Sequence, residues 1–356
     1  MALFKKIFKK DKTSPRGFHS LIVKAVDKIS SDTVRVMLDV PTELANDFQF
    51  KPGQYLNFAV TAGGKELRRS YSICSGDNED LAVAVKQVEN GKVSTWFNNE
   101  LNAGDSILVS VPEGNFLIPE NAETIVLFAA GSGITPILSM LKSINTYTQK
   151  VRLIYGNRTE SSILFKQEIE EIPNLSVLHF LSDEVNDNYE NGMIDAENLS
   201  TLIKADLDIL KSDAFMICGP EKMIVGIADT FKTFGVADSK VHYELFTTPT
   251  LLKKEEAPTG EKFKGKCHVT VILDDERVEF DLKSNEVVLD KAIDEGMDVP
   301  YSCKGGVCSA CKAKIIEGTV TMRLNHTLTD AEIAEGYIVT CQSEPTSETL
   351  VVTYDH

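Results

Sequence analysis

The sequence of 356 residues contains no apolar run long enough to span a membrane, and its first residues lack the hydrophobic segment of a signal peptide. It also lacks internal repeats and low-complexity tracts. Seven cysteines are too few for a disulfide framework in a chain of this length. These absences argue against stable membrane insertion and a disulfide-stapled fold, and they predict a cytoplasmic protein with reduced thiols.

Positive charge is also scarce, because 37 Lys and Arg stand against 53 Asp and Glu, for a net charge of −16. Such a chain would repel a nucleic-acid backbone, so we expect no nucleic-acid partner. Residues 267–356 carry 17 acidic and 7 basic side chains, a net charge of about −10. We expect this acidic surface to meet a basic partner protein; the alternative is that it only keeps the protein soluble.

The first ten residues, Met1–Lys10, are basic and weakly amphipathic. We assign residues 1–17 to a basic leader. We interpret this leader as a frayed terminus. The alternative is that it makes transient contact with an anionic surface.

Residues 18–118 alternate between apolar and polar positions in short segments separated by Gly, Pro and Asn turns. One helix is predicted at Val93–Leu101. Regularly spaced short strands with few helices predict a small antiparallel β-barrel. The expected strands are His19–Val26, Thr33–Val40, Gln54–Val60, Arg68–Ile73, Leu81–Val88 and Ser106–Val111.

Residues 119–246 follow a different pattern, which begins with the continuous apolar run Thr124–Ala130. Such a run is typical of a parallel strand buried on both faces. Alternating strands and helices predict a doubly wound α/β domain. The further strands are expected at Val151–Tyr155, Leu175–Phe180, Ala214–Cys218 and Val241–Phe246, and the helices at Pro136–Ile144, Ile163–Ile172, Asp195–Ile203 and Glu221–Phe234.

Residues 247–266 mix Thr, Pro, Lys, Glu and Gly without a period, which predicts an interdomain linker. Residues 267–356 form a third unit that opens with a hairpin pattern, Val269–Leu273 and Arg277–Leu282. A helix is expected at Val287–Glu295. We therefore predict three domains, the last of them an α+β (β-grasp) fold.

Four cysteines of the third unit follow the spacing C-x4-C-x2-C plus a distant fourth, at Cys303, Cys308, Cys311 and Cys341. This is the spacing of a plant-type [2Fe–2S] cluster, in which each iron takes two thiolates. Three thiolates would come from one glycine-containing loop and the fourth from a strand beside it. A zinc ribbon usually pairs two C-x2-C motifs, and the second is missing here.

The barrel contains Arg69-Ser-Tyr-Ser72, which suits a flavin. Arg69 offers a cation for pyrophosphate, Tyr71 a ring for the isoalloxazine and Ser72 a donor near N5; alternation places Arg69 and Tyr71 on one strand face. An ordinary strand is the alternative. The turn Asn90–Thr95 opens a helix whose free N–H groups suit an anion such as pyrophosphate. The alternative is a helix that is capped and binds no ligand.

In the α/β unit, Gly131-Ser-Gly-Ile-Thr-Pro136 follows the first strand and opens a helix, as expected of a dinucleotide site. A tight glycine turn is the alternative. Cys218-Gly-Pro220 ends a later strand at the same crevice, where Cys218 is either a packed thiol or a thiol beside the nicotinamide. Arg158 ends the second strand and is placed to meet the adenosine ribose or its 2′-phosphate, unless it is a solvated surface residue. Glu244 and Phe246 close the last strand near this crevice, or are plain edge residues.

The order of these signals resembles the ferredoxin–NADP reductase superfamily with a C-terminal [2Fe–2S] domain. Within it, the chain is most similar to reductase components of multicomponent oxygenases such as phenylacetyl-CoA epoxidase. The resemblance starts near Phe18 and is carried by Phe18–Leu21, Arg68–Cys74, Ala129–Pro136, Leu153–Thr159, Cys303–Cys308 and Gly336–Gln342. The basic leader departs from the family, as does Tyr55, where relatives carry His; we leave its role unassigned.

The resemblance implies three cofactors: FAD, NAD(P)H, with NADPH favoured by Arg158, and a [2Fe–2S] cluster. It places the cluster on Cys303, Cys308, Cys311 and Cys341, and the reaction beside Ser72, Cys218 and Glu244. The residues implied for FAD are Arg69, Ser70, Tyr71, Ser72, Lys86, Gly91, Lys92, Val93 and Ser94. Those implied for NAD(P)H are Gly131, Gly133, Thr135, Arg158, Cys218, Gly219, Pro220 and Phe246.

The implied activity is hydride transfer from NAD(P)H to FAD, then single-electron transfer through the cluster to a partner oxygenase that docks at the acidic third domain. A phenylacetyl-CoA epoxidase-type di-iron enzyme is the expected partner. The alternatives are a ring-hydroxylating dioxygenase, a steroid hydroxylase or a hybrid-cluster protein as acceptor. A redox-sensing module that binds flavin without turnover is the alternative from another class.

Overall fold

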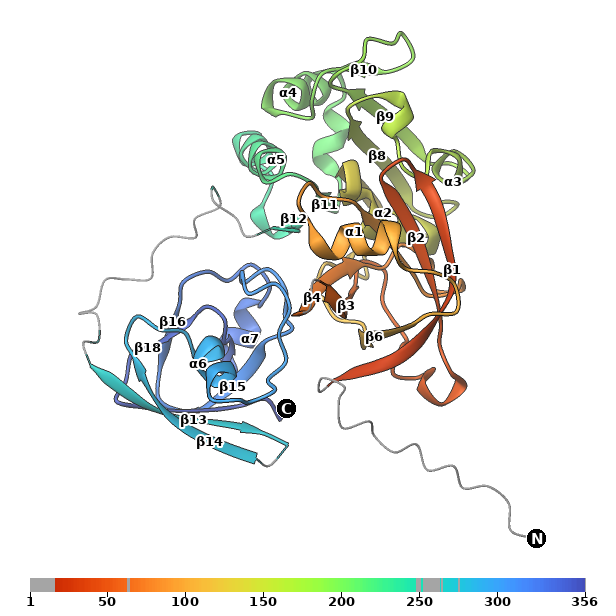
Figure 1. Ribbon diagram of the computed structural model, residues 1–356. Helices are drawn as coiled ribbons and strands as arrows, with labels where there is room; N and C mark the ends of the chain where they lie inside the picture. Colours follow the sequence, from red (N-terminus) through yellow and green to blue (C-terminus); the bar gives the residue numbers. More distant parts are fainter. Residues whose placement is uncertain are drawn as a thin grey trace.

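The computed structural model describes residues 17–62, 65–247, 251, 263, 265–274 and 276–355. The predicted leader, apart from Gly17, and most of the predicted linker lie outside these residues. Figure 1 shows three domains, coloured from red at the start of the chain to blue at its end. Among the helices of the described ranges, none is long and apolar enough to cross a membrane.

The barrel domain is one six-stranded antiparallel sheet in the order β4-β3-β6-β1-β2-β5. An antiparallel bridge between Ile73 and Val83 joins the two outer strands and closes the barrel. Helix α1 (Lys92–Asn99) packs with Phe97 in the barrel core. The strands are β1 (Phe18–Ser30), β2 (Thr33–Asp39), β3 (Tyr55–Ala62), β4 (Lys65–Ser72), β5 (Ala82–Lys86) and β6 (Ser106–Ser110).

The parallel-sheet domain has the strand order β10-β9-β8-β7-β11-β12, with every neighbouring pair parallel. The winding reverses between β7 and β11, where a doubly wound sheet opens its crevice. Its strands are β7 (Thr124–Ala130), β8 (Lys150–Asn157), β9 (Ser176–Leu181), β10 (Glu190–Asn191), β11 (Ala214–Cys218) and β12 (Val241–Glu244). Its helices are α2 (Ile134–Ser143), α3 (Lys166–Glu170), α4 (Ala196–Ala205) and α5 (Glu221–Thr233).

One predicted helix is much shorter than expected. The helix predicted over Ile163–Ile172 is reduced to α3, because Phe165 adopts a left-handed backbone with φ of 58°. Ile163, Leu164 and Phe165 are buried in the hydrophobic core in this non-helical conformation. Tertiary burial therefore overrides the local helical pattern.

The C-terminal domain is a five-stranded mixed sheet in the order β14-β13-β19-β15-β17, with β13 and β19 parallel. The predicted hairpin forms β13 and β14, and the predicted helix forms α6, which packs on the sheet with Val288 and Leu289. The strands are β13 (Lys266–Leu273), β14 (Glu276–Lys283), β15 (Lys312–Glu317), β16 (Val320–Met322), β17 (Tyr337–Val339), β18 (Ser343–Pro345) and β19 (Thr349–Thr353); the helices are α6 (Val288–Asp294) and α7 (Asp330–Ala334). The predicted fold class is confirmed in all three domains.

The hydrophobic cores are distributed unevenly between the domains. Cys74, Ala82 and Phe116 of the barrel side belong to the same core as Leu127 and Ile137 of the parallel-sheet domain. The core of the C-terminal domain contains only residues between Phe263 and Tyr354. The first two domains are thus joined by apolar packing, whereas the third has a core of its own.

Candidate functional site

Strand β4 carries two different sets of side chains on its two faces. Arg69 and Tyr71 lie on one face, as alternation predicts. Tyr71 packs edge-on against Phe97 with ring centroids 5.2 Å apart, and the exposed Arg69 donates from Nη1 to the backbone carbonyl of Arg68 at 2.6 Å. An exposed cation and a half-buried ring on one face fit a bound flavin nucleotide.

The opposite face of β4 points toward the other domains. Ser70 Oγ donates to Asn57 Oδ1 at 2.7 Å and lies 2.9 Å from Ser302 Oγ of the C-terminal domain. Ser72 Oγ donates to Glu244 Oε2 at 3.1 Å, at the end of β12. The strand predicted to hold the flavin therefore touches both other domains.

The remaining residues predicted for FAD lie around α1. Gly91 caps this helix, and a Cβ there would come within 2.5 Å of Ser94 Oγ, so the tight turn requires glycine. Lys92 and Val93 form the first turn, whose free N–H groups suit a phosphate. Lys86, at the end of β5, forms an ion pair with Asp32 at 3.3 Å.

Two loops meet at the switch point of the parallel sheet. Gly131–Gly133 follow β7, whereas Cys218 ends β11 and Gly219 follows it. A Cβ on Gly133 would lie 2.1 Å from the backbone carbonyl oxygen of Cys218, so the loops are in closest contact there. Gly131 has a φ of +52° and nothing within 4 Å of an added Cβ, which leaves open space above it. This cradle fits a nicotinamide dinucleotide.

Three further residues predicted for the nucleotide lie in α2, just before α5 and just after β8. Thr135 is buried and donates from Oγ1 to the carbonyl of Ser132 at 3.0 Å. Pro220 caps α5, and the buried Cys218 has a pKa well above its ordinary value because burial disfavours the thiolate. Arg158 is exposed at the end of β8.

Glu244 occupies the boundary of the barrel and the parallel sheet. The residue is half-buried, but its carboxyl group is enclosed, and burial raises its pKa to about 8. The hydrogen bond from Ser72 acts in the opposite direction by favouring the carboxylate. Glu244 therefore has a protonation state that changes near neutral pH, next to the proposed flavin ligand Ser72.

The four motif cysteines form two pairs. Cys308 Sγ donates to Cys303 Sγ at 3.0 Å, and Cys311 donates a hydrogen bond to Cys341. Two thiol pairs suit the two irons of a [2Fe–2S] cluster, which take two thiolates each. Cys303 is half-buried and the other three are buried, as a cluster shielded from water requires.

Backbone N–H groups surround these sulfurs. Gly305 N–H donates to Cys303 Sγ at 3.3 Å, and Gly306 N–H points to Cys341. The hydrogen bond from the Cys308 thiol is the main cause that lowers the pKa of Cys303, and backbone N–H donors lower it further. Both favour the thiolate that binds iron. Cys341 lies in the turn after β17, not in a strand as predicted, because the ladder between β15 and β17 ends at Val339.

A cavity of about 310 Å³ lies where the three domains meet. We call it the junction cavity. The barrel contributes Arg69 and Ser72, the parallel-sheet domain Glu244 and the C-terminal domain Cys303 and Cys308. Its full lining is Tyr55, Arg69, Ser70, Ser72, Glu244, Leu245, Phe246, Thr247, Cys303, Val307 and Cys308. Residues predicted for three cofactors thus share one cavity.

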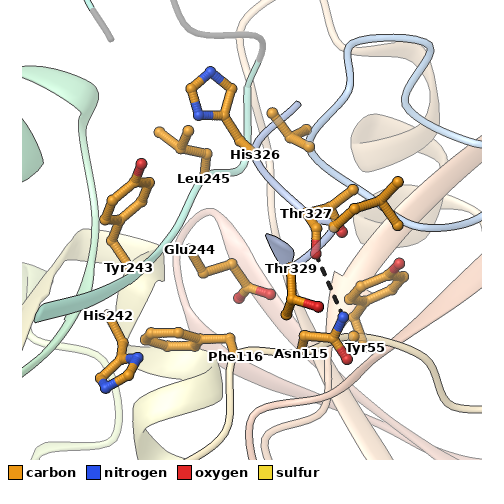
Figure 2. A pocket seen from close by; sticks show the side chains of 13 residues that line it. Tyr55, Asn115, Phe116, His242, Tyr243, Glu244, Leu245, His326, Thr327 and Thr329 are labelled. Carbon is orange, nitrogen blue, oxygen red and sulfur yellow. Dashed lines mark hydrogen bonds between the residues drawn. The ribbon is translucent and has the colours of Figure 1, made fainter. Parts of the chain in front are cut away.

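A second, smaller cavity of about 210 Å³ adjoins it and shares Tyr55 and Glu244. Figure 2 shows the Glu244 carboxylate pointing into this space, between residues of the barrel and of the C-terminal domain. Asn115 Nδ2 donates across it to the carbonyl of Thr327 at 3.4 Å. Glu244 therefore lies between two cavities.

The predicted residues are only partly brought together. Neither cavity is lined by Tyr71, Lys86, Gly91–Ser94, the Gly131–Thr135 loop, Arg158 or Cys218–Pro220. Conversely, the cavities include residues that no sequence motif had singled out: Asn115, Phe116, Leu245 and the segment His326–Thr329. Only Tyr55 had a signal, as a departure from the family pattern.

Three family models match the chain in succession. The oxidoreductase FAD-binding domain matches residues 20–118, the oxidoreductase NAD-binding domain residues 127–229 and the 2Fe-2S iron-sulfur cluster binding domain residues 271–346. The chain therefore contains the three cofactor-binding domains that the resemblance implied.

Three relatives are similar to this chain along most of their length. The chain is 36% identical to a subunit of 1,2-phenylacetyl-CoA epoxidase from Escherichia coli (strain K12), over 95% of this chain and 98% of that protein. It is 32% identical to the ferredoxin reductase component of 3-ketosteroid-9-alpha-monooxygenase from Rhodococcus rhodochrous, over 96% and 98%. It is 31% identical to NADH oxidoreductase HCR from Escherichia coli (strain K12), over 85% and 89%.

Among solved structures, phthalate dioxygenase reductase is similar along the whole chain. It has a TM-score of 0.56 and 25% identity, over 96% of this chain and 100% of that one. That protein is described as a modular structure for electron transfer from pyridine nucleotides to [2Fe–2S]. The chain belongs to the family of NAD(P)H-dependent flavin and iron–sulfur oxidoreductases that serve as reductase components of oxygenases.

Proposed function

We propose that this chain takes a hydride from NAD(P)H and delivers single electrons to an oxygenase of the phenylacetyl-CoA epoxidase type. The observation that carries this proposal is the junction cavity, where Arg69, Ser72, Glu244, Cys303 and Cys308 meet. A reductase of this kind must bring the flavin, the nicotinamide and the cluster within a short distance of one another, and the lining of this cavity comes from all three domains.

On the flavin side, FAD supplies the conversion between a hydride and single electrons when it is bound. Arg69 holds the pyrophosphate, Tyr71 packs on the ring and Ser72 donates a hydrogen bond at the N5 side. Asn57 and Ser302 fix the orientation of Ser70. The N-terminal turn of α1, with Gly91, Lys92, Val93 and Ser94, and Lys86 complete the proposed FAD site.

On the nucleotide side, the cradle of Gly131, Gly133 and Cys218 receives the pyrophosphate and nicotinamide. Thr135, Gly219, Pro220 and Phe246 complete the proposed site, and Cys218 and Glu244 border the nicotinamide. Glu244 holds or releases a proton beside Ser72 near neutral pH. We propose NADPH as the preferred donor, because Arg158 offers an exposed cation where an NAD-specific fold usually has a carboxylate.

On the cluster side, Cys303, Cys308, Cys311 and Cys341 hold the two irons. The oxygenase docks on the acidic surface of the C-terminal domain. Three exposed carboxylates at α6 support this: Asp290, Asp294 and Glu295. Asp290 pairs with Lys304 of the cysteine loop at 2.9 Å, so this acidic face lies beside the cluster ligands.

The acceptor is proposed from the relatives. The phenylacetyl-CoA epoxidase subunit is 36% identical over nearly the full length, which favours an epoxidase of that type over a steroid monooxygenase. We further propose a cytoplasmic location and domain bounds of 18–118, 119–246 and 267–356, with a linker at 247–266.

The test combines the purified chain with purified oxygenase components. Under anaerobic conditions, NADPH is mixed with the chain while flavin bleaching is followed by absorbance and cluster reduction by electron paramagnetic resonance. In air, NADPH oxidation and product formation are measured with phenylacetyl-CoA and the epoxidase subunits. Parallel reactions contain 3-ketosteroid monooxygenase or a ring-hydroxylating dioxygenase with its substrate.

We expect rapid bleaching, cluster reduction and product only with the epoxidase subunits. Product with another oxygenase at a higher rate would show that the acceptor is wrong while the electron path is right. Flavin bleaching without cluster reduction, or slow reduction that never reaches an acceptor, would favour a redox-sensing module and contradict the proposed function.

A further inference from the structure

Arg68 lies in the same motif as the proposed flavin ligands but on the other face of β4. Its side chain is only 4% exposed, although it carries a permanent charge. Such a group is stable only when it is paired. Flavin-binding roles are proposed for Arg69, Tyr71 and Ser72, but none is proposed for Arg68.

The partners of Arg68 come from two domains. Nε donates to Glu66 Oε1 at 2.9 Å within the barrel, and Nη2 donates to Asp298 Oδ1 of the C-terminal domain at 3.0 Å. The guanidinium also lies over two rings, 5.3 Å from the centroid of Phe18 and 4.5 Å from that of Tyr301. A planar, delocalised cation can pair and stack at once, which a lysine cannot reproduce.

Phe18 thereby also gains a role. It opens β1 and belongs to a motif that no cofactor explains. Its ring, from the barrel, and the ring of Tyr301, from the C-terminal domain, both lie within cation–π distance of the Arg68 guanidinium. This ring environment is thus built from both domains and is complete only when they are in contact.

Tyr301 and Asp298 lead directly into the cluster ligands. Ser302, which touches Ser70 Oγ at 2.9 Å, follows Tyr301, and Cys303 follows Ser302. At the other end of the loop, Ser309 N–H donates to Tyr55 Oη at 2.9 Å, immediately after Cys308. The contacts with the barrel therefore hold the two cysteines that line the junction cavity.

Polar interactions contribute to the contact between these domains. They include those of Arg68, Ser70 and Tyr55 and the hydrogen bonds of Asn115 to Thr327 and Glu332. The C-terminal domain has its own hydrophobic core, whereas the barrel and the parallel sheet share one. Polar contacts of this kind hold a domain in place and also allow its release.

We propose that Arg68 is a positioning residue that docks the C-terminal domain on the barrel and so places Cys303 and Cys308 at the flavin cavity. The guanidinium acts through Asp298 and Tyr301, not on a cofactor. Its loss lowers the population of the docked arrangement and slows electron transfer from flavin to cluster. This inference rests on the proposed function, in which electrons pass from flavin to cluster.

The test uses the full-length holoprotein with three single variants: Arg68→Gln, Asp298→Asn and Tyr301→Leu. Asp298 is half-exposed, so its isosteric change carries little folding risk. Arg277→Gln is the matched control, because Arg277 is exposed on β14 of the same domain and its change alters the net charge as Arg68→Gln does. Arg68→Lys tests whether charge alone suffices.

Two readouts are measured. Rapid mixing with NADPH separates flavin reduction from cluster reduction, and amide hydrogen exchange of residues 298–309 reports docking without any turnover. We expect cluster reduction to slow and exchange to rise, each about tenfold, in Arg68→Gln and Asp298→Asn, with a change in the same direction in Tyr301→Leu. Flavin reduction in Asp298→Asn and the cluster resonance spectrum should match the wild type. Arg68→Lys should be intermediate and Arg277→Gln unchanged.

Unchanged exchange and unchanged cluster reduction in both Arg68→Gln and Asp298→Asn would overturn the docking role. An equal effect of Arg277→Gln would overturn it as well, since net charge alone would then explain the change. A wild-type cluster that NADPH does not reduce would instead contradict the proposed function, while the exchange measurement would still decide whether Arg68 docks the domain.

Discussion

Ser72 and Glu244 are 172 positions apart in the sequence and are joined by a hydrogen bond of 3.1 Å. The bond connects the end of β4 in the barrel to the end of β12 in the parallel sheet. A hydroxyl proposed to face the flavin and a carboxyl proposed to border the nicotinamide therefore form one unit. The first prediction concerns the protonation of the Glu244 carboxyl in this pair.

Glu244→Gln should change how stability depends on pH. Burial raises the pKa of Glu244 to about 8, above the ordinary carboxyl value of 4.5. Between these values the folded protein keeps a proton that the unfolded chain has lost, so stability falls as pH rises through this window. Since glutamine cannot ionise, the variant should gain about 1 to 2 kcal/mol over the wild type at pH 9 and nothing at pH 5.

Urea unfolding of both proteins at pH 5, 7 and 9 measures this difference. Glu79→Gln serves as a control without pH dependence, because hydrogen bonds from Lys142 and Gly76 lower the pKa of that carboxyl below its ordinary 4.5 against the opposing effect of burial, so it stays largely ionised at all three pH values. A gain for Glu244→Gln that is the same at every pH would show that Glu244 does not titrate in this range.

Gly133→Ala should damage the nucleotide cradle. The added methyl would lie 2.1 Å from the carbonyl oxygen of Cys218, and a backbone atom cannot move aside cheaply. We expect a loss of about 1 to 3 kcal/mol in unfolding free energy and weaker NADPH binding by calorimetry. Gly226→Ala is the control, because its Cβ would make only an ordinary contact, 3.8 Å from the backbone N of Ala196, and alanine favours a helix such as α5. Equal affinity in both variants would contradict the proposed cradle.

Cys308→Ser should remove the cluster and leave the flavin chemistry intact. Iron content should fall from about two per chain to near zero, while flavin reduction by NADPH proceeds at the wild-type rate. Cys267→Ala, a buried cysteine of the same domain outside the motif, should keep its iron. Loss of flavin reduction in Cys308→Ser would show that the domains do not function as separate modules.

Arg158→Ala should weaken the use of NADPH more than that of NADH. An exposed cation that meets the 2′-phosphate contributes to binding one donor only, so KM for NADPH should rise about tenfold and KM for NADH by less than a factor of two. Arg158→Lys should retain part of the preference. A wild-type preference for NADH, the donor named for one relative, would show that Arg158 is not a phosphate ligand.

Turnover with the oxygenase should fall as salt rises. Between about 0.01 M and about 0.15 M salt the Debye length shortens from roughly 30 Å to roughly 8 Å, which screens the acidic surface. Flavin reduction should change far less. The double variant of Asp290→Asn and Asp294→Asn should flatten the salt dependence, while Glu197→Gln with Asp229→Asn on the parallel-sheet domain should not. An equal salt dependence of turnover in the wild type and both double variants would show that the acidic surface only keeps the protein soluble.

The local patterns of the sequence predicted the fold class of all three domains, but not the individual strands β15 to β19. Thr124–Ala130 forms β7 with the predicted ends, because a buried parallel strand is recognisable from its continuous apolar run. Gly131–Gly133 lies at the switch point of the sheet, since strand order determines where the crevice opens. The cysteine spacing likewise identified the four thiols, which the structure arranges as two pairs.

Contacts between domains could not be predicted in this way. Nothing near Ser72 in the sequence points to Glu244, and Tyr55 shows no sign of its bond to Ser309. Arg68 and Arg69 are adjacent and alike in sequence, yet one is enclosed between two domains and the other is exposed. These differences arise from the packing of folded domains against one another. Tertiary burial, which local sequence patterns do not show either, also shortened the helix at α3. The roles assigned to individual cofactor ligands remain predictions.

The separate core of the C-terminal domain has an evolutionary consequence. In the described part of the chain no sheet crosses into this domain, and its core residues pack among themselves, while Val307 packs against the core of the parallel sheet. Its own core would stay intact if the domain separated from the other two. An iron–sulfur carrier of this kind is portable: it can be fused at either end of a reductase, or supplied as a separate polypeptide, without rebuilding the interior of either piece.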